Sequence, residues 1–142
     1  AGSTGYFLEA AEVCYAAGIK QGYKPEFAIC ADEVPAGRPK PWMIYRCMEA
    51  LDVYPPRRVV KVGDTVVDIE DGLNAGVWSV AVVDSSSEMG LAPEEYAALP
   101  PDERDARRAQ VRDKFLAAGA DCVLDSLNEL PAYIRALNSV SA

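Results

Sequence analysis

Apolar residues recur along the chain in two alternating patterns. Helical spacing of apolar side chains predicts helices over residues 7–18, 42–51, 65–75, 93–98, 101–118 and 127–137. Between these segments, short apolar runs predict buried strands at 27–30, 59–62, 77–83 and 121–124. Residues 2–6, which are glycines, hydroxyl residues and a tyrosine, are interpreted as a loop that leads directly into the first helix.

Strands that alternate with helices indicate βαβ units, and such units form a parallel sheet with right-handed crossovers. The predicted strands are short and almost uniformly apolar, which suits a sheet that is covered by helices on both faces. A chain of 142 residues is long enough for one domain with a buried core. We therefore predict an α/β fold, in which ligands bind beyond the carboxyl ends of the strands.

Composition and charge remove several classes of function. Half of the residues are apolar, yet no apolar run approaches the roughly 18 residues that a membrane-spanning helix needs. The net charge of −8 argues against nucleic acid as a partner, and the alternating charges of residues 102–114 are interpreted as a solvated helix face. The chain contains no histidine, which excludes any mechanism that needs an imidazole from these residues. Carboxylates, hydroxyls, lysines and arginines remain as candidates.

The cysteines favour a reducing compartment. Cys14, Cys30, Cys47 and Cys122 are too far apart in sequence to form a CxxC clamp, so a zinc site is not expected. Each has apolar neighbours, which favours buried, reduced thiols over disulfides. With no signal peptide visible, this pattern predicts a cytoplasmic protein.

Two carboxylates follow the predicted 59–62 strand at informative positions. Asp64 comes directly after Gly63, and Asp68 lies one turn into the next helix. Carboxylates at a strand end suit Mg²⁺, which takes one or two of them together with water and phosphate oxygens. Thr65 and Asp68 also match a capping box, so Asp68 is either part of such a site or a helix cap. Asp64 is interpreted as functional because a carboxylate there has no cap to make.

Two further segments could bind an anion. Arg38 precedes Pro39 in a stiff, proline-rich loop after the 27–30 strand, and its planar guanidinium suits a phosphoryl or phosphonyl group. The alternative is an exposed arginine in a surface loop. Ser3 and Thr4 precede a helix whose first N–H groups could hold an anion, and the alternative there is an ordinary helix cap.

Taken in chain order, the hydroxyl segment, the cationic loop and the strand followed by Gly-Asp resemble the second, third and fourth motifs of the haloacid dehalogenase (HAD) superfamily. Within it, Gly2–Tyr6, Val34–Met43 and Lys61–Asp68 are similar to motifs of the phosphonoacetaldehyde hydrolases, or phosphonatases. The resemblance also takes in Lys20–Pro25 and Ser87–Leu91. It implies a Rossmann-like HAD core with a parallel sheet, in which residues 1–142 form the carboxyl-terminal portion without the first strand and the helical cap.

The resemblance implies a hydrolase of phosphonate degradation that cleaves the carbon–phosphorus bond of phosphonoacetaldehyde, a small-molecule phosphonate, to give acetaldehyde and phosphate. Ser3 and Thr4 would contact the phosphoryl group, with a catalytic role for Thr4, and Tyr6 would be an adjacent pocket residue. Arg38 would bind the phosphonate oxygens as a further catalytic residue.

The fourth motif implies a magnesium-dependent reaction. Asp64 would be a ligand of the Mg²⁺ cofactor, and Asp68 would support the metal site or its neighbouring groups as part of the catalytic set. The metal would neutralise charge on the phosphonate while an aspartate attacks phosphorus and a lysine holds the aldehyde as a Schiff base.

That aspartate and that lysine would both precede residue 1 in members of this family. The chain is therefore expected to represent the carboxyl-terminal half of the enzyme, to be inactive alone and to require the missing amino-terminal half, with a homodimer also possible. The alternatives are a non-catalytic α/β fragment or subunit that binds Mg²⁺ and phosphate, or another HAD phosphatase. A phosphate-accepting receiver domain fits poorly, because it would need an acidic pair after the first strand.

Overall fold

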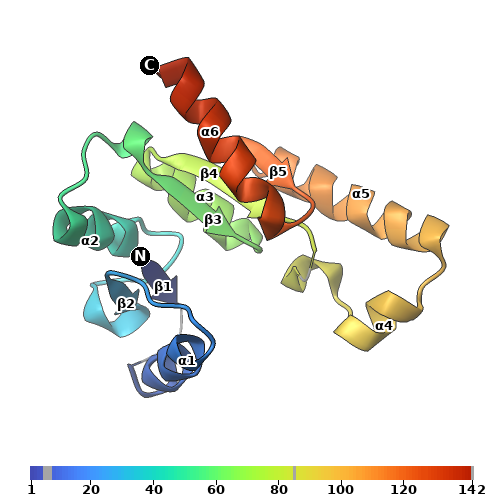
Figure 1. The fold of residues 1–142 in the computed structure, drawn as a ribbon, viewed down its shortest axis with the longest axis horizontal. Coiled ribbons are helices and arrows are strands. Elements are labelled where there is room, and N and C mark those ends of the chain that lie inside the picture. Colours follow the sequence, from blue (N-terminus) through green and yellow to red (C-terminus); the bar gives the residue numbers. More distant parts are fainter. Residues whose placement is uncertain (5–7, 85, 142) are drawn as a thin grey trace. The chain divides into compact units, whose positions relative to one another are not determined.

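The computed structural model describes residues 1–4, 8–84 and 86–141 (Figure 1). The chain packs as two compact units, and each is described by itself. The first unit comprises Ala1–Lys61 and Glu70–Trp78, and the second comprises Val62–Ile69 and Ser79–Ala142. Three elements contribute residues to both units: strand β3 (Val60–Gly63), helix α3 (Val66–Ala75) and strand β4 (Trp78–Val82).

The first unit contains a two-stranded parallel sheet. Strand β1 (Gly2–Thr4) pairs with strand β2 (Ala28–Cys30), with Gly2 opposite Ala28 and Thr4 opposite Cys30. The prediction that residues 2–6 form a loop is therefore wrong for Gly2–Thr4. Small residues have little β propensity of their own, and this strand is created by backbone pairing with a segment far away in sequence.

Glycine leaves room at the start of β1 for two tyrosines that pack against it. A Cβ atom on Gly2 would lie 2.5 Å from the Tyr23 Oη, which is closer than real Cβ atoms approach, and 3.0 Å from the Tyr15 Cε1, which is a tight contact. The Tyr15 hydroxyl in turn donates to the Ile29 carbonyl of β2 at 3.2 Å. The two tyrosines therefore fix β1 against the rest of its unit.

The helices of the first unit are α1 (Leu8–Lys20) and α2 (Trp42–Leu51). Buried Met43 of α2 packs with Ile29 and Val34, and buried Ile44 packs with Ala75 and Val77. The apolar face of α2 therefore joins β2 to the carboxyl-terminal part of α3. The bounds of α2 agree with the sequence prediction, since its apolar residues recur at helical spacing and Asp52 ends the helix in the left-handed conformation.

The second unit is built on the carboxyl-terminal portion of a three-stranded sheet with the order β3-β4-β5. Strand β5 (Cys122–Leu124) pairs with β4 in parallel, with Val80 opposite Cys122. Parallel pairing in both sheets confirms the predicted α/β class, which follows from the alternation of strands and helices.

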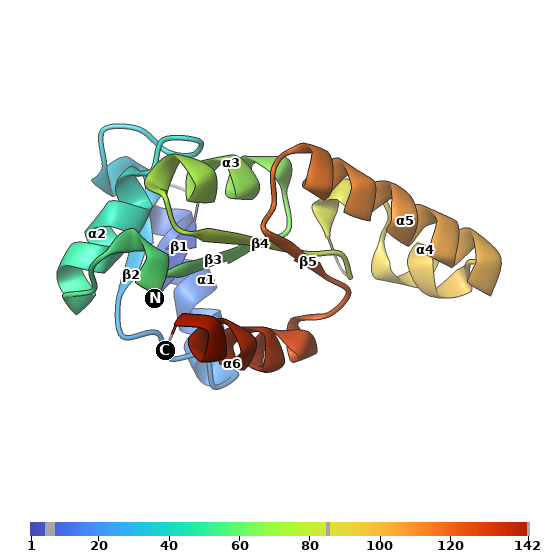
Figure 2. The same cartoon turned by 90° about the horizontal axis from the view of Figure 1, so that it is seen from above.

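Three helices belong wholly to the second unit: α4 (Pro93–Ala98), α5 (Pro101–Ala117) and α6 (Leu130–Ser141). Helices α5 and α6 lie on opposite faces of this part of the sheet (Figure 2). Phe115 of α5 is completely buried and packs with Ile69, Ala81 and Val123. None of the described helices is long and apolar enough to cross a membrane.

The cysteines differ in exposure more than the sequence predicts. Cys30 is buried as expected, Cys47 and Cys122 are half-buried, and Cys14 is exposed, so the prediction is wrong for Cys14. The reason is that α1 carries apolar residues around much of its circumference, and periodicity does not identify one buried face. Burial and hydrogen bonds to the Asp32 and Glu33 carboxylates raise the pKa of the Cys30 thiol to about 12.

Candidate active site

Asp64 lies directly beyond the carboxyl end of β3, where the sequence predicts it. It borders an open hollow of about 420 Å³ that is also lined by Asp84, which follows β4, and by Ser126, which follows β5. All of these residues belong to the second unit. The hollow therefore lies at the sheet edge where ligands bind in parallel α/β folds.

The turn that carries Asp64 is held by two serines that follow β4. The buried Ser86 hydroxyl donates to the Asp64 carbonyl at 2.6 Å. The backbone N–H and the hydroxyl of Ser87 both donate to Oδ2 of Asp64, each at 3.3 Å. The sequence does not indicate these contacts to the Asp64 carboxylate, because Ser87 approaches it from a segment 23 residues away.

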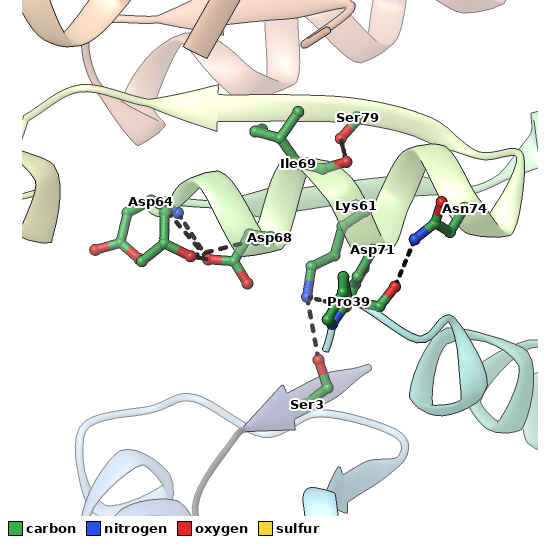
Figure 3. A network of polar contacts seen from close by, with 10 residues as sticks. Ser3, Pro39, Lys61, Asp64, Asp68, Ile69, Asp71, Asn74 and Ser79 are labelled. Atoms are coloured by element: carbon green, nitrogen blue, oxygen red, sulfur yellow. Dashed lines mark hydrogen bonds and ion pairs between the residues drawn. The ribbon is translucent and has the colours of Figure 1, made fainter. Parts of the chain in front are cut away.

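Asp68 fixes the same turn from inside α3 (Figure 3). Its Oδ2 accepts from the backbone N–H groups of Asp64 and Thr65, each at 3.2 Å, and from the Thr65 hydroxyl at 2.8 Å. The Asp68 N–H donates back to the Thr65 hydroxyl at 3.2 Å. This reciprocal pattern is a capping box, which is one of the two interpretations of Asp68 that the sequence allows. The carboxylate is 5% exposed, so its geometric effect is to orient the backbone at Asp64.

Gly63 allows β3 and α3 to approach closely at this turn. A Cβ atom on Gly63 would lie 2.3 Å from the Cβ of Asp68 and 2.6 Å from its Oδ2. Any side chain at residue 63 would therefore displace the carboxylate that holds the turn. The position requires glycine because of this contact.

Glu88 is a second acidic group at the start of α3. Its Oε1 accepts from the Val66 N–H at 3.2 Å, and its Oε2 accepts from the Lys114 ammonium at 2.5 Å. The hydrogen bond from Lys114 is the main cause that lowers the pKa of Glu88, and the Val66 N–H contributes in the same direction. A charged carboxylate near the first turn of a helix also interacts favourably with the helix dipole.

The sequence did not single out Asp84, although it follows a strand as Asp64 does. Arg108 of α5 binds the Asp84 carboxylate through Nε at 3.0 Å and through Nη2 at 2.7 and 2.8 Å. One turn further along α5, Arg112 pairs with Asp125, which follows β5. The signal that could have found these pairs is the combination of acids at strand ends and arginines four residues apart on one helix.

Most of residues 102–114 are exposed, as the interpretation of a solvated face expects, whereas Arg108 and Arg112 are half-buried in these ion pairs. Arg107 and Arg112 also donate to the carbonyls of Met89 and Val123, at 3.2 and 3.0 Å. One face of α5 is therefore tied to the loops that border the hollow. Alternating charge along a helix does not reveal this, because the partners lie in other segments.

Ser3 and Arg38 belong to the first unit. The Ser3 hydroxyl accepts a hydrogen bond from the Lys61 ammonium at 3.3 Å. Arg38 is half-buried in the loop before α2, and the amide of Asn74 pins that loop by donating to the Pro39 carbonyl at 2.7 Å (Figure 3). Thr4 lies in β1, where its backbone is opposite Cys30 of β2. Tyr6 lies outside the described residues.

The donor set around the hollow is compatible with Mg²⁺. No group of three or more metal-binding side chains occurs among the residues that the structure describes. Magnesium does not require one, because it commonly binds one or two carboxylates and completes its octahedron with water and substrate phosphate oxygens. Asp64 is half-buried at the edge of the hollow, whereas Asp84 is already bound by a guanidinium. Asp64 is thus the residue here that suits the metal.

Residues 3–76 match the family model of the haloacid dehalogenase-like hydrolases. The chain is 43% identical over 140 residues to a phosphonoacetaldehyde hydrolase-like protein of Syntrophobacter fumaroxidans, covering 99% of this chain and 50% of that protein. It is 44% identical over 137 residues to a phosphonoacetaldehyde hydrolase of Parabacteroides distasonis, covering 96% and 52%. The chain therefore spans about half the length of the curated relatives it matches.

Solved structures give the same picture of the fold. The crystal structure of a phosphonoacetaldehyde hydrolase-like protein from Oleispira antarctica matches with a TM-score of 0.91 and 35% identity, covering 97% of this chain and 50% of that chain. A haloacid dehalogenase-like protein of Agrobacterium tumefaciens matches with a TM-score of 0.65 and 22% identity. The latter likeness is one of fold alone.

Proposed function

Because this chain belongs to the haloacid dehalogenase-like hydrolase family, we propose that it is part of an enzyme that hydrolyses phosphonoacetaldehyde to acetaldehyde and phosphate. The observation that carries the proposal is the 43–44% identity over nearly the whole chain to relatives that bear that name. The turn of Gly63, Asp64 and Asp68 supports it, since it presents a carboxylate at the carboxyl edge of a parallel sheet.

In this proposal hydroxyl groups and a guanidinium bind the phosphonate. Ser3 and Thr4 donate hydrogen bonds to its oxygens, and Tyr6 lines the adjacent pocket. The Arg38 guanidinium takes two phosphonate oxygens at once, because its planar fork matches their geometry. Charge neutralisation by these donors stabilises the extra negative charge that phosphorus acquires during attack.

In the same proposal Asp64 and Asp68 have the roles that concern the metal. Asp64 holds the Mg²⁺, and Asp68 keeps the turn rigid through the Asp64 and Thr65 N–H groups. When bound, Mg²⁺ supplies Lewis-acid stabilisation of the phosphonate oxygens. Ser86 and Ser87 limit the motion of Asp64, so that its carboxylate is oriented before the metal arrives.

The groups that form covalent bonds belong, in this proposal, to the half of the relatives that residues 1–142 do not span. They are the aspartate that attacks phosphorus and the lysine that forms a Schiff base with the aldehyde. Attack on phosphorus breaks the carbon–phosphorus bond, and the electron pair passes to the carbon as part of an enamine with the lysine. The carbon then takes a proton to give an imine, and water hydrolyses the imine to release acetaldehyde and the free lysine. Water releases phosphate from the aspartate. A cytoplasmic location and a homodimer are part of the same proposal.

The test compares the complete protein, meaning the full reading frame that contains residues 1–142, with residues 1–142 alone. We expect the complete protein to release acetaldehyde and phosphate in equal amounts from phosphonoacetaldehyde with Mg²⁺, and residues 1–142 to release none. Coupled reduction of acetaldehyde and a colorimetric phosphate assay measure the two products. Turnover by residues 1–142 alone would show that the covalent groups are misplaced. A complete protein that hydrolyses only phosphate monoesters would point to another phosphatase of the family.

Arg38→Ala in the complete protein is expected to lower kcat/KM by about 100-fold, because a charge-assisted, bidentate contact to the phosphonate is lost. The measurement is initial rate against phosphonoacetaldehyde concentration. Arg46→Ala is the matched control, since it removes an exposed arginine from α2 of the same unit. Equal rates in the two variants would contradict a role for Arg38 in binding.

A further inference from the structure

Lys61 is a charged residue at a position in the middle of a strand, where an apolar residue is usual. Its neighbours along β3 are Val60 and Val62, and its side chain is 12% exposed. Two partners from distant segments meet its ammonium group: the Asp71 carboxylate at 3.8 Å and the Ser3 hydroxyl at 3.3 Å (Figure 3). All of these contacts lie within the first unit.

Stability alone does not account for this arrangement. The side chain of Asp71 is 1% exposed, so both charges of the pair have lost most of their hydration. A buried ion pair is often no more stable than two well-packed apolar residues, because desolvation offsets the attraction between the charges. The position of this lysine inside a strand therefore indicates a role for its hydrogen bonds.

The direction of the hydrogen bond to Ser3 follows from chemistry. An ammonium group only donates, so the Ser3 oxygen must accept from Lys61. The hydroxyl proton of Ser3 is then directed away from Lys61, so it can be donated to another acceptor. A hydroxyl donor that is polarised by an adjacent positive charge is suited to a phosphoryl oxygen.

We propose that Lys61, held in place by Asp71, is a positioning residue that orients the Ser3 hydroxyl as a donor to the phosphoryl group. The proposal rests on the function proposed above, in which Ser3 contacts that group. Asp71 acts one step further away, because it compensates the charge of Lys61 and restricts where its ammonium can lie. The pair lies on β3 and α3, so two elements of the core fix a residue of the short strand β1.

The experiment uses inorganic phosphate as the probe and the complete protein with Mg²⁺. Phosphate affinity is measured by calorimetry, and stability is measured as the thermal unfolding temperature. Lys61→Met is expected to lower both, since it removes the donor to Ser3 and takes the Lys61 ammonium away from the buried Asp71 carboxylate. The double variant Lys61→Met with Asp71→Leu removes both charges, so we expect it to recover most of the unfolding temperature. Its phosphate affinity is expected to remain about tenfold lower.

The double variant separates positioning from structure. A residue that served only stability would regain phosphate affinity together with the unfolding temperature, and that result would overturn the proposal. Lys24→Met is the matched control, because it removes an exposed lysine of the same unit and is expected to change neither quantity.

Ser3→Ala keeps the test decisive if the charge variants do not fold, because it leaves both buried charges in place. We expect it to lower phosphate affinity by about the same tenfold factor, and combining it with Lys61→Met should lower the affinity no further. Unchanged affinity in Ser3→Ala overturns the proposal. If the unsubstituted protein does not bind phosphate, the proposed function fails and this inference fails with it. If the unsubstituted protein and the double variant bind phosphate with equal affinity, the positioning role of Lys61 is overturned, while the proposed function is not affected.

Discussion

Asp64→Asn in the complete protein is expected to reduce the Mg²⁺-dependent hydrolysis of phosphonoacetaldehyde by about 1,000-fold, since the metal contributes several kcal/mol of charge stabilisation. The amide has the shape of the carboxylate and its oxygen still accepts from Ser87, so the turn remains in place. Only the negative charge that attracts the metal is lost. The measurement is kcat as a function of Mg²⁺ concentration, with acetaldehyde as the detected product.

Asp113→Asn provides the control for this prediction. Asp113 is an exposed residue of α5 in the same unit, and its replacement changes the net charge by the same amount. We expect its rate and its Mg²⁺ dependence to equal those of the unsubstituted protein. An Asp64→Asn enzyme with an unchanged rate would refute the assignment of Asp64 as the metal ligand, while leaving the reaction itself untouched.

Phe115→Ala is expected to lower the free energy of unfolding by about 3–5 kcal/mol, the usual cost of removing a fully buried aromatic ring. The Phe115 side chain is 0% exposed and packs against Ile69, Ala81 and Val123 from three other elements. Removal of the ring therefore leaves a cavity that is lined by residues of three separate elements. Urea denaturation followed by circular dichroism measures the loss for residues 1–142 and for the complete protein.

The neighbouring residue is the control for the core prediction. Leu116 is 51% exposed on the same helix, so Leu116→Ala removes a similar volume without opening a buried cavity. We expect its effect to stay below about 1 kcal/mol, as for most surface substitutions. Equal losses for the two variants would mean that α5 does not pack through Phe115.

Much of the fold could be predicted because its signals are local. Helix α2 follows from apolar residues at helical spacing, and β4 follows from a short, largely apolar run between Gly76 and the serine-rich loop. The capping box of α3 is equally local, since Thr65 and Asp68 are three residues apart. These features need no information about the rest of the chain.

Other features depended on partners that the sequence does not identify. Strand β1 has no apolar pattern, and Gly2 is explained only by the Tyr15 and Tyr23 rings that pack on it. The exposure of Cys14 also had to come from the structure, since α1 has no single apolar face.

By itself, then, the sequence determined the α/β class, the position of Asp64 at the end of a strand and the capping-box pattern of Thr65 and Asp68, because each is encoded within a few neighbouring residues. Only the tertiary structure decided that Arg108 binds Asp84 and that Lys61 reaches Ser3, which lies 58 residues away. Such contacts arise when strands and helices pack, and which partner meets a charged group depends on the path of the whole chain. Apart from Asp68, the groups that orient the candidate site are of this second kind.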